Sequence, residues 1–435
     1  MPGNLVHITT FGCQMNEYDS ERIAGLLERA GYVLTEEEEA ADIILFNTCS
    51  VRDTAEQRLY GRVWELKPLK QENPDLIIGI CGCMGQLYGE EMVKKVPIVD
   101  LVMGPRQIPE IAHFIETIQS TRKPLVKVGF DDPYQNEQVV KRKDQFKDYV
   151  SIMEGCNHVC TFCIVPYTRG KQINRPPEEI LKQIHKLADE GCKEVTLLGQ
   201  NVDAWRHNGM GFGELLNAVN DIEGIERIRY SSPHPSHITS SVIEAIEKSI
   251  KVCESFHLPI QSGSNRILKE MKRVYTVEKY MELVYQIQSR WPDAGLSTDI
   301  VVGFPGETKE EFEETLQVMR EVQYDNAFCF MFSPRTGTPA ATMENQIPLE
   351  VRKERVTRLI DIQVDIMDKK MKSHIGKTFE ILVEGESNVG REHLFGRTRS
   401  NIVSAFPPAK NVKVGDLVHV KVTDASAYTL FSEIV

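Results

Sequence analysis

The sequence predicts an α/β protein with three parts: an N-terminal open parallel sheet, a central partial (β/α)6 barrel and a small C-terminal all-β barrel. Apolar runs alternate with amphipathic helical patterns over residues 1–121 and again over 148–373, which is typical of parallel sheets covered by helices. From residue 374 the runs become short and are separated by Gly, Asn and Pro, which favours a small barrel. Residues 122–147 break the alternation and are expected to form a linker.

The first two parts divide into individual strands and helices. The N-terminal strands are expected at Leu5–Thr10, Ile43–Phe46, Leu76–Ile80 and Ile98–Val102, with helices at Asn16–Ala30, Thr54–Leu69, Glu90–Lys95 and from Ile108. The central strands are expected at Tyr149–Met153, Glu194–Leu198, Ile225–Tyr230, Ser255–Leu258, Gly295–Val302 and Asn326–Phe332. Helices are expected between them at Pro177–Glu190, Ser240–Lys248, Val277–Ser289 and Lys309–Val322. Six such units predict a parallel barrel, partial or complete.

A long helix and a set of short strands complete the chain. Over Leu349–Lys372 apolar residues recur at steps of three and four, as on one face of a helix. Short strands are expected at Phe379–Val383, Leu394–Thr398, Val403–Phe406 and Leu417–Val422. About five short strands in a C-terminal barrel of this size suit contact with an oligonucleotide or RNA.

Composition limits the classes of protein that remain. The chain has 435 residues, enough for about three domains. The net charge of −12, from 51 Lys and Arg against 63 Asp and Glu, argues against a surface that attracts nucleic acid everywhere. We expect a soluble, cytoplasmic protein, because the first residues do not resemble a signal peptide and no apolar run reaches the ~18 residues of a membrane helix. In that compartment thiols stay reduced, so clustered cysteines indicate metal binding or redox chemistry.

Three of the ten cysteines lie close together, just past a predicted strand. Cys156, Cys160 and Cys163 have the spacing C-x₃-C-x₂-C. Three thiolates at this spacing can bind three corners of an iron–sulfur cube and leave the fourth iron open for catalysis. A structural zinc site is the alternative, but it needs a fourth ligand, and His158 has no obvious geometry to supply one.

Three further cysteines are far apart in sequence but share one position. Cys13, Cys49 and Cys83 each follow one of the first three predicted strands. Loops that follow parallel strands meet along one edge of the sheet, where ligands bind. Unrelated core cysteines are the alternative, since cysteine is among the most buried residue types. The shared position predicts a second site, whereas Cys81, Cys192, Cys253 and Cys329 are expected to pack in the interior.

The sequence motifs around both cysteine groups resemble those of the radical S-adenosylmethionine (SAM) methylthiotransferases, in the MiaB-type branch that acts on tRNA. The likeness rests on the segments TFGCQMNEYDS from Thr10, NTCSVR from Asn47 and CNHVCTFCIVPYTRG from Cys156. It covers essentially the whole chain. It implies a methylthiotransferase N-terminal domain over 1–121, a radical SAM core over 148–373 and a TRAM domain over 374–435.

The resemblance also implies the cofactors and the reaction. Cys13, Cys49 and Cys83 would bind an auxiliary [4Fe–4S] cluster, and Cys156, Cys160 and Cys163 the radical-SAM [4Fe–4S] cluster. One SAM would donate the methyl group and another would be the radical source. The product would carry a 2-methylthio group on N6-isopentenyladenosine at position 37 of the tRNA.

Other loops that follow strands are candidates for binding SAM. The Val302–Thr308 loop contains Gly-Phe-Pro-Gly, which alone is most often a simple turn, but its glycines would allow a ligand close to the backbone. The expected SAM-binding residues are Phe162, Gln200, Ser232, Gln261, Ser262, Gly303, Phe304, Pro305, Gly306 and Arg335. Turn formation is an almost equal interpretation for several of them. Gln172 and Asn174 depart from the family, which usually has Glu and Ser there.

Contact with tRNA is expected at local basic sites. The candidate residues are Arg397, Arg399, Arg169 and Arg175. The expected partners are a tRNA anticodon stem-loop and a flavodoxin- or ferredoxin-type electron donor, with no membrane, and the chain is expected to be a monomer. The sulfur carrier is not indicated by the sequence.

Two other functions remain open at this stage. The first is methylthiolation of threonylcarbamoyl-adenosine in tRNA or of a ribosomal-protein aspartate. The second is a non-catalytic iron–sulfur or zinc protein that binds RNA through its terminal barrel.

Overall fold

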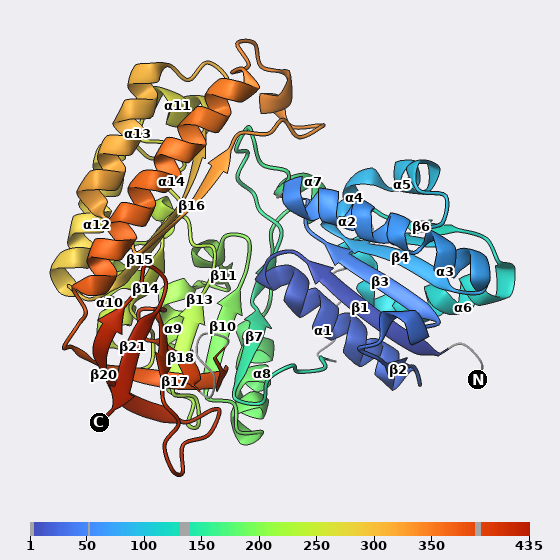
Figure 1. Ribbon diagram of the computed structural model, residues 1–435, viewed down its shortest axis with the longest axis horizontal. Coiled ribbons are helices and arrows are strands. Elements are labelled where there is room, and N and C mark those ends of the chain that lie inside the picture. Colours follow the sequence, from blue (N-terminus) through green and yellow to red (C-terminus); the bar gives the residue numbers. More distant parts are fainter. Residues whose placement is uncertain (1–3, 51–52, 131–139, 388–392) are drawn as a thin grey trace.

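The computed structural model describes residues 4–50, 53–130, 140–387 and 393–435. Three bodies follow one another along the chain (Figure 1): an N-terminal α/β domain, a central β/α array and a C-terminal barrel. No helix in these ranges is long and apolar enough to cross a membrane.

The N-terminal domain is a six-stranded parallel sheet in the order β2-β1-β3-β4-β5-β6. Its strands are β1 Leu5–Phe11, β2 Val33–Leu34, β3 Ile43–Thr48, β4 Ile77–Gly82, β5 Leu101–Met103 and β6 Leu125–Lys127. The four predicted strands are confirmed. The two edge strands were not predicted, because two or three residues are too few to show a pattern. Since β6 belongs to the sheet, the expected linker begins after Lys127 and not at residue 122; residues 131–139 lie outside the described ranges.

Helices cover both faces of this sheet and enclose two separate apolar cores. They are α1 Gln14–Arg29, α2 Asp53–Glu65, α3 Lys67–Glu72, α4 Cys83–Tyr88, α5 Glu90–Lys95 and α6 Ile111–Thr121, with short 3₁₀ turns at Glu38–Ala40 and Pro105–Glu110. The single helix expected over Thr54–Leu69 is two helices that divide at Leu66. Pro68 explains the break, because proline has no backbone N–H to donate to the carbonyl four residues earlier and its ring clashes with that carbonyl.

The central domain contains two three-stranded parallel sheets, in the orders β13-β10-β7 and β14-β15-β16. Its strands are β7 Lys147–Ser151, β10 Glu194–Leu198, β13 Arg227–Tyr230, β14 Ser255–His257, β15 Gly295–Val302 and β16 Asn326–Met331. A parallel bridge between Ile228 and Val252 joins the sheets next to β14. The six strands therefore form one curved array, which confirms the expected partial barrel.

The helices of this domain lie outside the curved array (Figure 1), and its largest apolar core lies between them and the strands. They are α8 Pro177–Asp189, α9 Phe212–Asn220, α10 Ser240–Lys248, α11 Asn265–Glu270, α12 Val277–Arg290, α13 Lys309–Val322 and α14 Leu349–Lys372. The smaller elements are β8 Met153–Glu154, α7 Val165–Thr168, β9 Ile173–Asn174, β11 Arg206–His207, β12 Met210–Gly211 and 3₁₀ turns at Val202–Ala204, Pro235–His237 and Pro339–Thr342. The long helix α14 has the predicted bounds and packs against α13 and β16.

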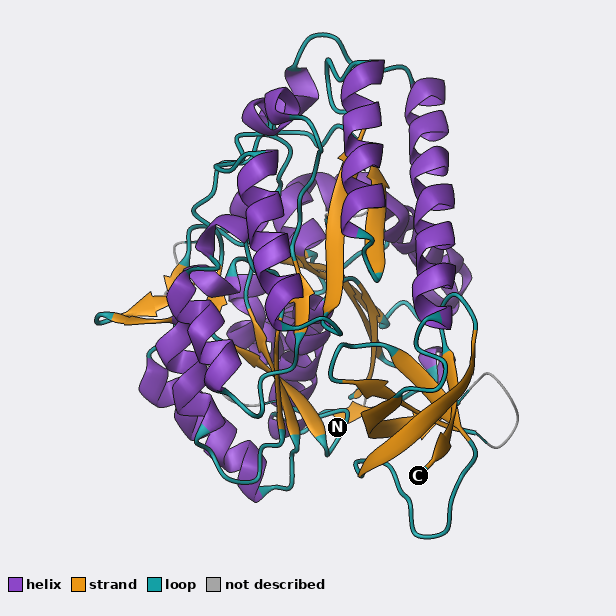
Figure 2. Cartoon of the chain, turned by 90° about the vertical axis from the view of Figure 1, so that its left-hand side faces the viewer, coloured by secondary structure: helices purple, strands orange, loops and turns teal. Residues whose placement is uncertain are grey.

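The C-terminal domain is a closed five-stranded barrel in the order β17-β18-β19-β21-β20 (Figure 2). Its strands are β17 Thr378–Glu386, β18 Leu394–Thr398, β19 Val403–Phe406, β20 Leu417–Ala425 and β21 Leu430–Ile434. The barrel is docked on the central domain by arginines. Arg227 and Arg229, on β13, donate to backbone carbonyls at the end of β18, including those of Arg397 and Arg399.

Candidate functional site

The three scattered cysteines meet at one edge of the N-terminal sheet, as predicted. Cys13 immediately precedes α1, Cys49 directly follows β3, and Cys83 is the first residue of α4. Strands β1, β3 and β4 are neighbours in the sheet, so their carboxyl ends lie side by side. A hydrogen bond between the Cys13 and Cys49 side chains is the main cause that lowers the pKa of Cys13, to about 6. Burial raises the pKa of the Cys83 thiol.

A buried amide network fixes the loops that carry these thiols. Asn16 donates to the side-chain oxygen of Asn47 at 3.2 Å, and Asn47 donates back to the Asn16 carbonyl at 2.8 Å and to the Ser20 hydroxyl at 2.9 Å. The Cys13 thiol in turn donates to the Asn16 side-chain oxygen at 3.4 Å. A side chain at Gly82, whose φ is 85°, would lie 2.3 Å from Asn47, so the turn before Cys83 requires glycine.

The second cysteine group lies on the loop between β8 and α7 of the central domain. The Cys156 sulfur accepts the backbone N–H of His158 at 3.4 Å, and Arg273 donates to the Cys160 sulfur at 3.6 Å. Burial raises the pKa of Cys163 to about 12 and raises that of Cys156 as well. Gly155 has a φ of 77°, and a side chain there would lie 2.3 Å from the Lys171 carbonyl.

Both thiol sets suit an iron–sulfur cluster with an open iron. Each set offers three thiols held by loops or helix starts at the ends of strands. Thiolates are the usual ligands of such clusters, and a bound metal keeps buried thiols deprotonated. Cys81, by contrast, is fully buried in an apolar core, which confirms its expected packing role.

Two of the expected SAM-binding aromatic residues join the cluster loop to the Gly-Phe-Pro-Gly turn. Phe304 is fully buried and packs edge-on against Phe332 at 5.5 Å between ring centroids. Phe162 packs against the same apolar group. The Gln200 side chain accepts the backbone N–H of Gly155, so it contacts the loop next to Cys156.

The remaining expected SAM-binding residues lie in turns at the ends of strands. Gln261 and Ser262 are buried, Ser232 is exposed, and Gln261 and Ser232 have positive φ angles of 71° and 55°. Gly303 donates its backbone N–H to Glu307, and Gly306 donates to the Asn345 carbonyl at 2.9 Å; Pro305 between them is buried.

Arg335 reaches across to the N-terminal domain. Its guanidinium lies 3.5 Å from the Glu56 carboxylate of α2. The Tyr88 hydroxyl donates to the same carboxylate at 2.8 Å. In this structure Arg335 therefore links two domains.

The expectation that four arginines bind tRNA must be corrected in part. Arg169 and Arg175 are only 3% and 1% exposed, so neither can contact RNA in this structure. Arg175 donates to the side-chain oxygen of Gln183 at 2.9 Å. Arg399 donates twice to the Glu254 carboxylate at 2.8 Å, which directs its charge to the central domain. Arg397 is 38% exposed at its side chain and lies 3.4 Å from Glu384.

The two residues that depart from the family contact each other. The Gln172 amide donates to the Asn174 side-chain oxygen at 3.0 Å and to the Ala204 carbonyl at 3.1 Å. Asn174 donates to the Arg206 carbonyl at 2.9 Å. A neutral amide pair therefore closes this side of the cluster loop.

Sequence reasoning missed two groups around the cysteines. The first is the buried set Asn16, Asp19 and Ser20. Their spacing from Cys13 places them on one face of a helix, a signal that could have found them.

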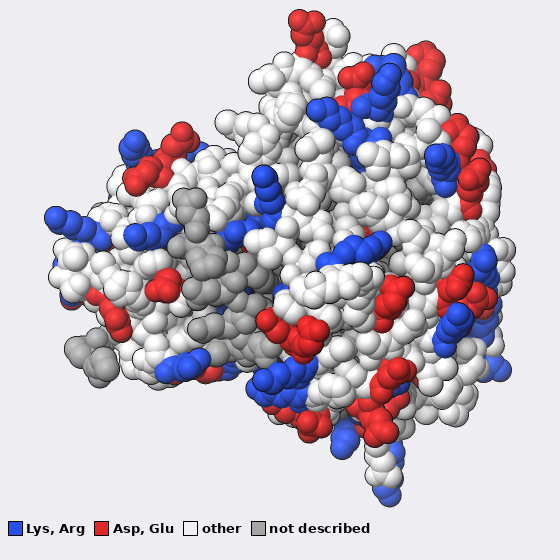
Figure 3. Space-filling view, turned by 180° about the vertical axis from the view of Figure 1, so that it is seen from behind, with Lys and Arg blue, Asp and Glu red and all other residues white. Residues whose placement is uncertain are grey.

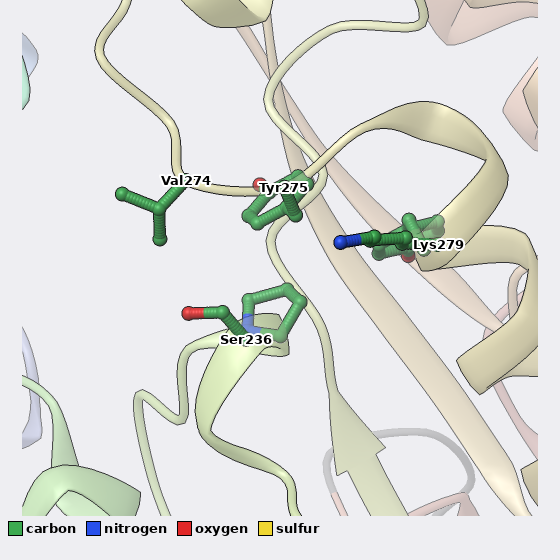
Figure 4. Close-up of a pocket in the computed structure, with 6 residues that line it drawn as sticks. Ser236, Val274, Tyr275 and Lys279 are labelled. Carbon is green, nitrogen blue, oxygen red and sulfur yellow. The ribbon is translucent and has the colours of Figure 1, made fainter.

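The second missed group is a cluster of His158, His234 and His237, whose candidate ligand nitrogens all lie within 4.8 Å of one another. The His158 and His234 rings are stacked 10° from parallel, so their lone pairs do not converge on one ion. Burial lowers the pKa of His234 to about 2 and that of His237 to about 4, so these are neutral packed rings. Beside them, Tyr275 and Lys279 face Ser236 across a small pocket (Figure 4), which contains none of the cysteines.

Comparison with known proteins agrees with this arrangement. Models of uncharacterized protein family UPF0004, the radical SAM superfamily and the TRAM domain match residues 5–104, 150–319 and 372–435. A solved radical SAM methyltransferase, TsrM from Kitasatospora setae, has the same fold over 78% of this chain and 77% of its own, with a TM-score of 0.57 and 14% identity.

Relatives of known name are much closer in sequence. The tRNA-2-methylthio-N(6)-dimethylallyladenosine synthase of Clostridium botulinum strain Hall is 46% identical over 98% of this chain and 96% of its own length. The synthase of the same name from Symbiobacterium thermophilum is 45% identical over 100% of this chain and 95% of its own. The chain belongs to this family of tRNA methylthiotransferases, which are radical SAM enzymes.

Proposed function

We propose that this protein methylthiolates C2 of N6-isopentenyladenosine (dimethylallyladenosine) at position 37 of tRNA. The observation that carries the proposal is the presence of two separate three-thiol sites, one on each of two adjoining domains. Cys13, Cys49 and Cys83 form one, and Cys156, Cys160 and Cys163 form the other. Two such sites suit a reaction that needs both a radical and a sulfur donor.

Each site has a separate part in the chemistry. When bound, the two [4Fe–4S] clusters would supply reductive cleavage of SAM at one site and sulfur at the other, with one SAM as methyl donor and another as radical source. Cys156, Cys160 and Cys163 would hold the first cluster, and Cys13, Cys49 and Cys83 the second. The chain's own contribution is to hold the thiolates and to leave one iron of each cluster open.

The surrounding side chains orient the loops and exclude water. Gln200 holds the turn before Cys156, and the apolar group of Phe162 and Phe304 closes the space behind the cysteine loop. We infer that SAM binds against this group and against the turns that contain Ser232, Gln261, Ser262 and Gly303–Gly306. Glycine in the last of these turns allows the ligand to lie close to the backbone.

Binding of tRNA would depend on local basic groups and on the C-terminal barrel. Acidic and basic side chains are intermingled on the face seen in Figure 3, so the whole surface does not act as a binding field. Arg397, whose side chain is partly exposed, is the candidate that remains. We propose a cytoplasmic monomer that receives electrons from a flavodoxin- or ferredoxin-type donor.

Anaerobic reconstitution tests the enzyme against a non-catalytic metal protein. The proposal expects about eight irons per chain, as two four-iron clusters, and cleavage of SAM to 5′-deoxyadenosine. Bound zinc with no cleavage of SAM would refute it. Mass spectrometry of nucleosides from cells that lack the protein tests the substrate: loss of 2-methylthio-isopentenyladenosine supports the proposal, and its retention with loss of the threonylcarbamoyl product favours the sibling activity.

Two cysteine variants test the division of roles. Cys156→Ala should abolish SAM cleavage, because the open iron that binds SAM belongs to that site. Cys13→Ala should retain SAM cleavage but fail to insert sulfur. Equal loss of SAM cleavage in a folded Cys13→Ala protein would contradict the assignment.

A further inference from the structure

Arg169 is a buried cation between the two cysteine sites. It directly follows α7, the short helix that comes after Cys163 and packs against α4. Helix α4 begins at Cys83. The guanidinium is therefore close to both loops and shielded from solvent, with only 3% of the residue exposed.

Its contacts join the N-terminal and central domains. Arg169 donates to the Asp19 carboxylate of α1 at 2.6 Å, and its other terminal nitrogen lies 3.8 Å from the Glu154 carboxylate of β8. The guanidinium also interacts electrostatically with the Cys83 and Cys13 thiols, so both lie within its field. A planar guanidinium suits this place, because its donors can serve several acceptors at once.

Once a cluster is bound, the negative charge around the auxiliary site needs a nearby cation. Three thiolates would add negative charge next to the buried carboxylates of Asp19 and Glu154. A buried charge without a partner is strongly unfavourable. Hydrogen bonds to the sulfur ligands and the net charge around a cluster also set its reduction potential.

We propose that Arg169 is a positioning residue whose guanidinium acts on the Cys83 sulfur through its charge and raises the reduction potential of the auxiliary cluster. Asp19 holds the guanidinium in place. This inference rests on the proposed assignment of Cys13, Cys49 and Cys83 as cluster ligands. Its role is distinct from the RNA contact expected from the sequence.

The test measures the potential of the auxiliary cluster alone. A full-length Cys156→Ala/Cys160→Ala/Cys163→Ala protein retains only one of the two proposed sets of cluster ligands, Cys13, Cys49 and Cys83, and iron analysis of this parent checks the proposed function by itself. Arg169→Gln is then added, and the reduced cluster is followed by electron paramagnetic resonance during a redox titration. Arg22→Gln is the matched control, because Arg22 is also buried and lies 3.9 Å from the same Asp19 carboxylate.

Arg169→Gln should shift the midpoint potential to a more negative value, and Arg169→Lys should shift it less because the charge is kept. Arg22→Gln should cause a clearly smaller shift. An unchanged potential in Arg169→Gln, or an equal shift in Arg22→Gln, would overturn the proposal.

A second variant distinguishes an electrostatic effect from general damage. Asp19→Asn removes a negative charge but keeps a side-chain oxygen that can still accept a hydrogen bond from the Arg169 guanidinium, so the potential should become more positive. A negative shift in both Asp19→Asn and Arg169→Gln would mean that only packing was disturbed, and would contradict the proposal.

Discussion

The hydrogen bonds of the Gln172 side chain require an amide that can donate. Its nitrogen donates to the Asn174 side chain and to the Ala204 carbonyl. A carboxylate there would face two oxygens with no proton to donate. Gln172→Glu should therefore lower the free energy of unfolding by about 1–3 kcal/mol.

Chemical denaturation of the protein at neutral pH measures this effect. The double variant Gln172→Glu/Asn174→Ser is the comparison, because it restores the pair of residues that the family usually has. If Gln172→Glu is as stable as the parent, the amide contacts do not contribute to stability.

Helix α4 must lie very close to its neighbouring strands. A side chain at Gly85 would lie 2.3 Å from the Met103 carbonyl of β5 and 3.0 Å from that of Ile80. Gly85→Ala should therefore displace α4, destabilise the fold by about 1–3 kcal/mol and reduce iron binding at Cys83. Thermal unfolding and iron content after reconstitution measure the two effects.

Gly61 offers the matched control on helix α2. A side chain there would meet no atom within 4 Å. Gly61→Ala should raise stability by about 0.5–1 kcal/mol, since alanine favours helix more than glycine does. Similar losses in both variants would argue against a specific close approach at Gly85.

At the scale of the whole molecule, the terminal barrel is docked by an ion pair. Arg399 donates both to the Glu254 carboxylate and to the Ile250 and Val252 carbonyls. Arg399→Ala should reduce stability by about 1–3 kcal/mol and increase cleavage by protease between the domains. The exchanged pair Arg399→Glu/Glu254→Arg should recover part of the loss.

Arg397, which lies on β18 two residues before Arg399, distinguishes docking from RNA contact. Arg397→Ala should change stability by less than about 0.5 kcal/mol, because its ion pair is partly exposed. It should weaken tRNA binding in a salt-dependent way. In the opposite result, Arg399→Ala weakens tRNA binding at unchanged stability and Arg397→Ala does not. That result would show that Arg399, and not Arg397, contacts the RNA.

The contact between α1 and β7 makes the stability depend on pH. Burial raises the pKa of Glu21 to about 7, with repulsion from Asp148 as the next cause, and burial raises the pKa of Asp148 to about 6. The Glu21 Oε2 atom is buried and has no hydrogen-bond partner among the described residues. The folded state therefore binds more protons than the unfolded state between about pH 4 and 7.

The free energy of unfolding should accordingly contain a part that falls as pH rises through that window. Glu21→Gln should remove most of this part and so flatten the dependence between pH 5 and 7.5, measured by urea unfolding. The exposed Glu28→Gln variant on the same helix is the control. An unchanged slope in Glu21→Gln would refute the assignment.

Much of the architecture could be predicted from the sequence because it depends on local patterns. Apolar periodicity predicted the bounds of α10, α13, α14 and β15 without error. Short elements such as β2 and β6 were missed, since edge strands of two or three residues have no pattern of their own. Pro68 divided a predicted helix, a break that the residue type indicates but that periodicity alone does not.

The sequence by itself determined the two cysteine sets, because spacing and position after a strand are properties of the chain. Only the tertiary structure decided where the side chains of Arg169, Arg335 and Arg399 lie and which carboxylates they contact. Their partners Asp19, Glu56 and Glu254 lie about 150 or more residues away along the chain. An arginine on the surface and an arginine buried beside a carboxylate look the same in the sequence. Only folding brings the distant carboxylate next to the guanidinium.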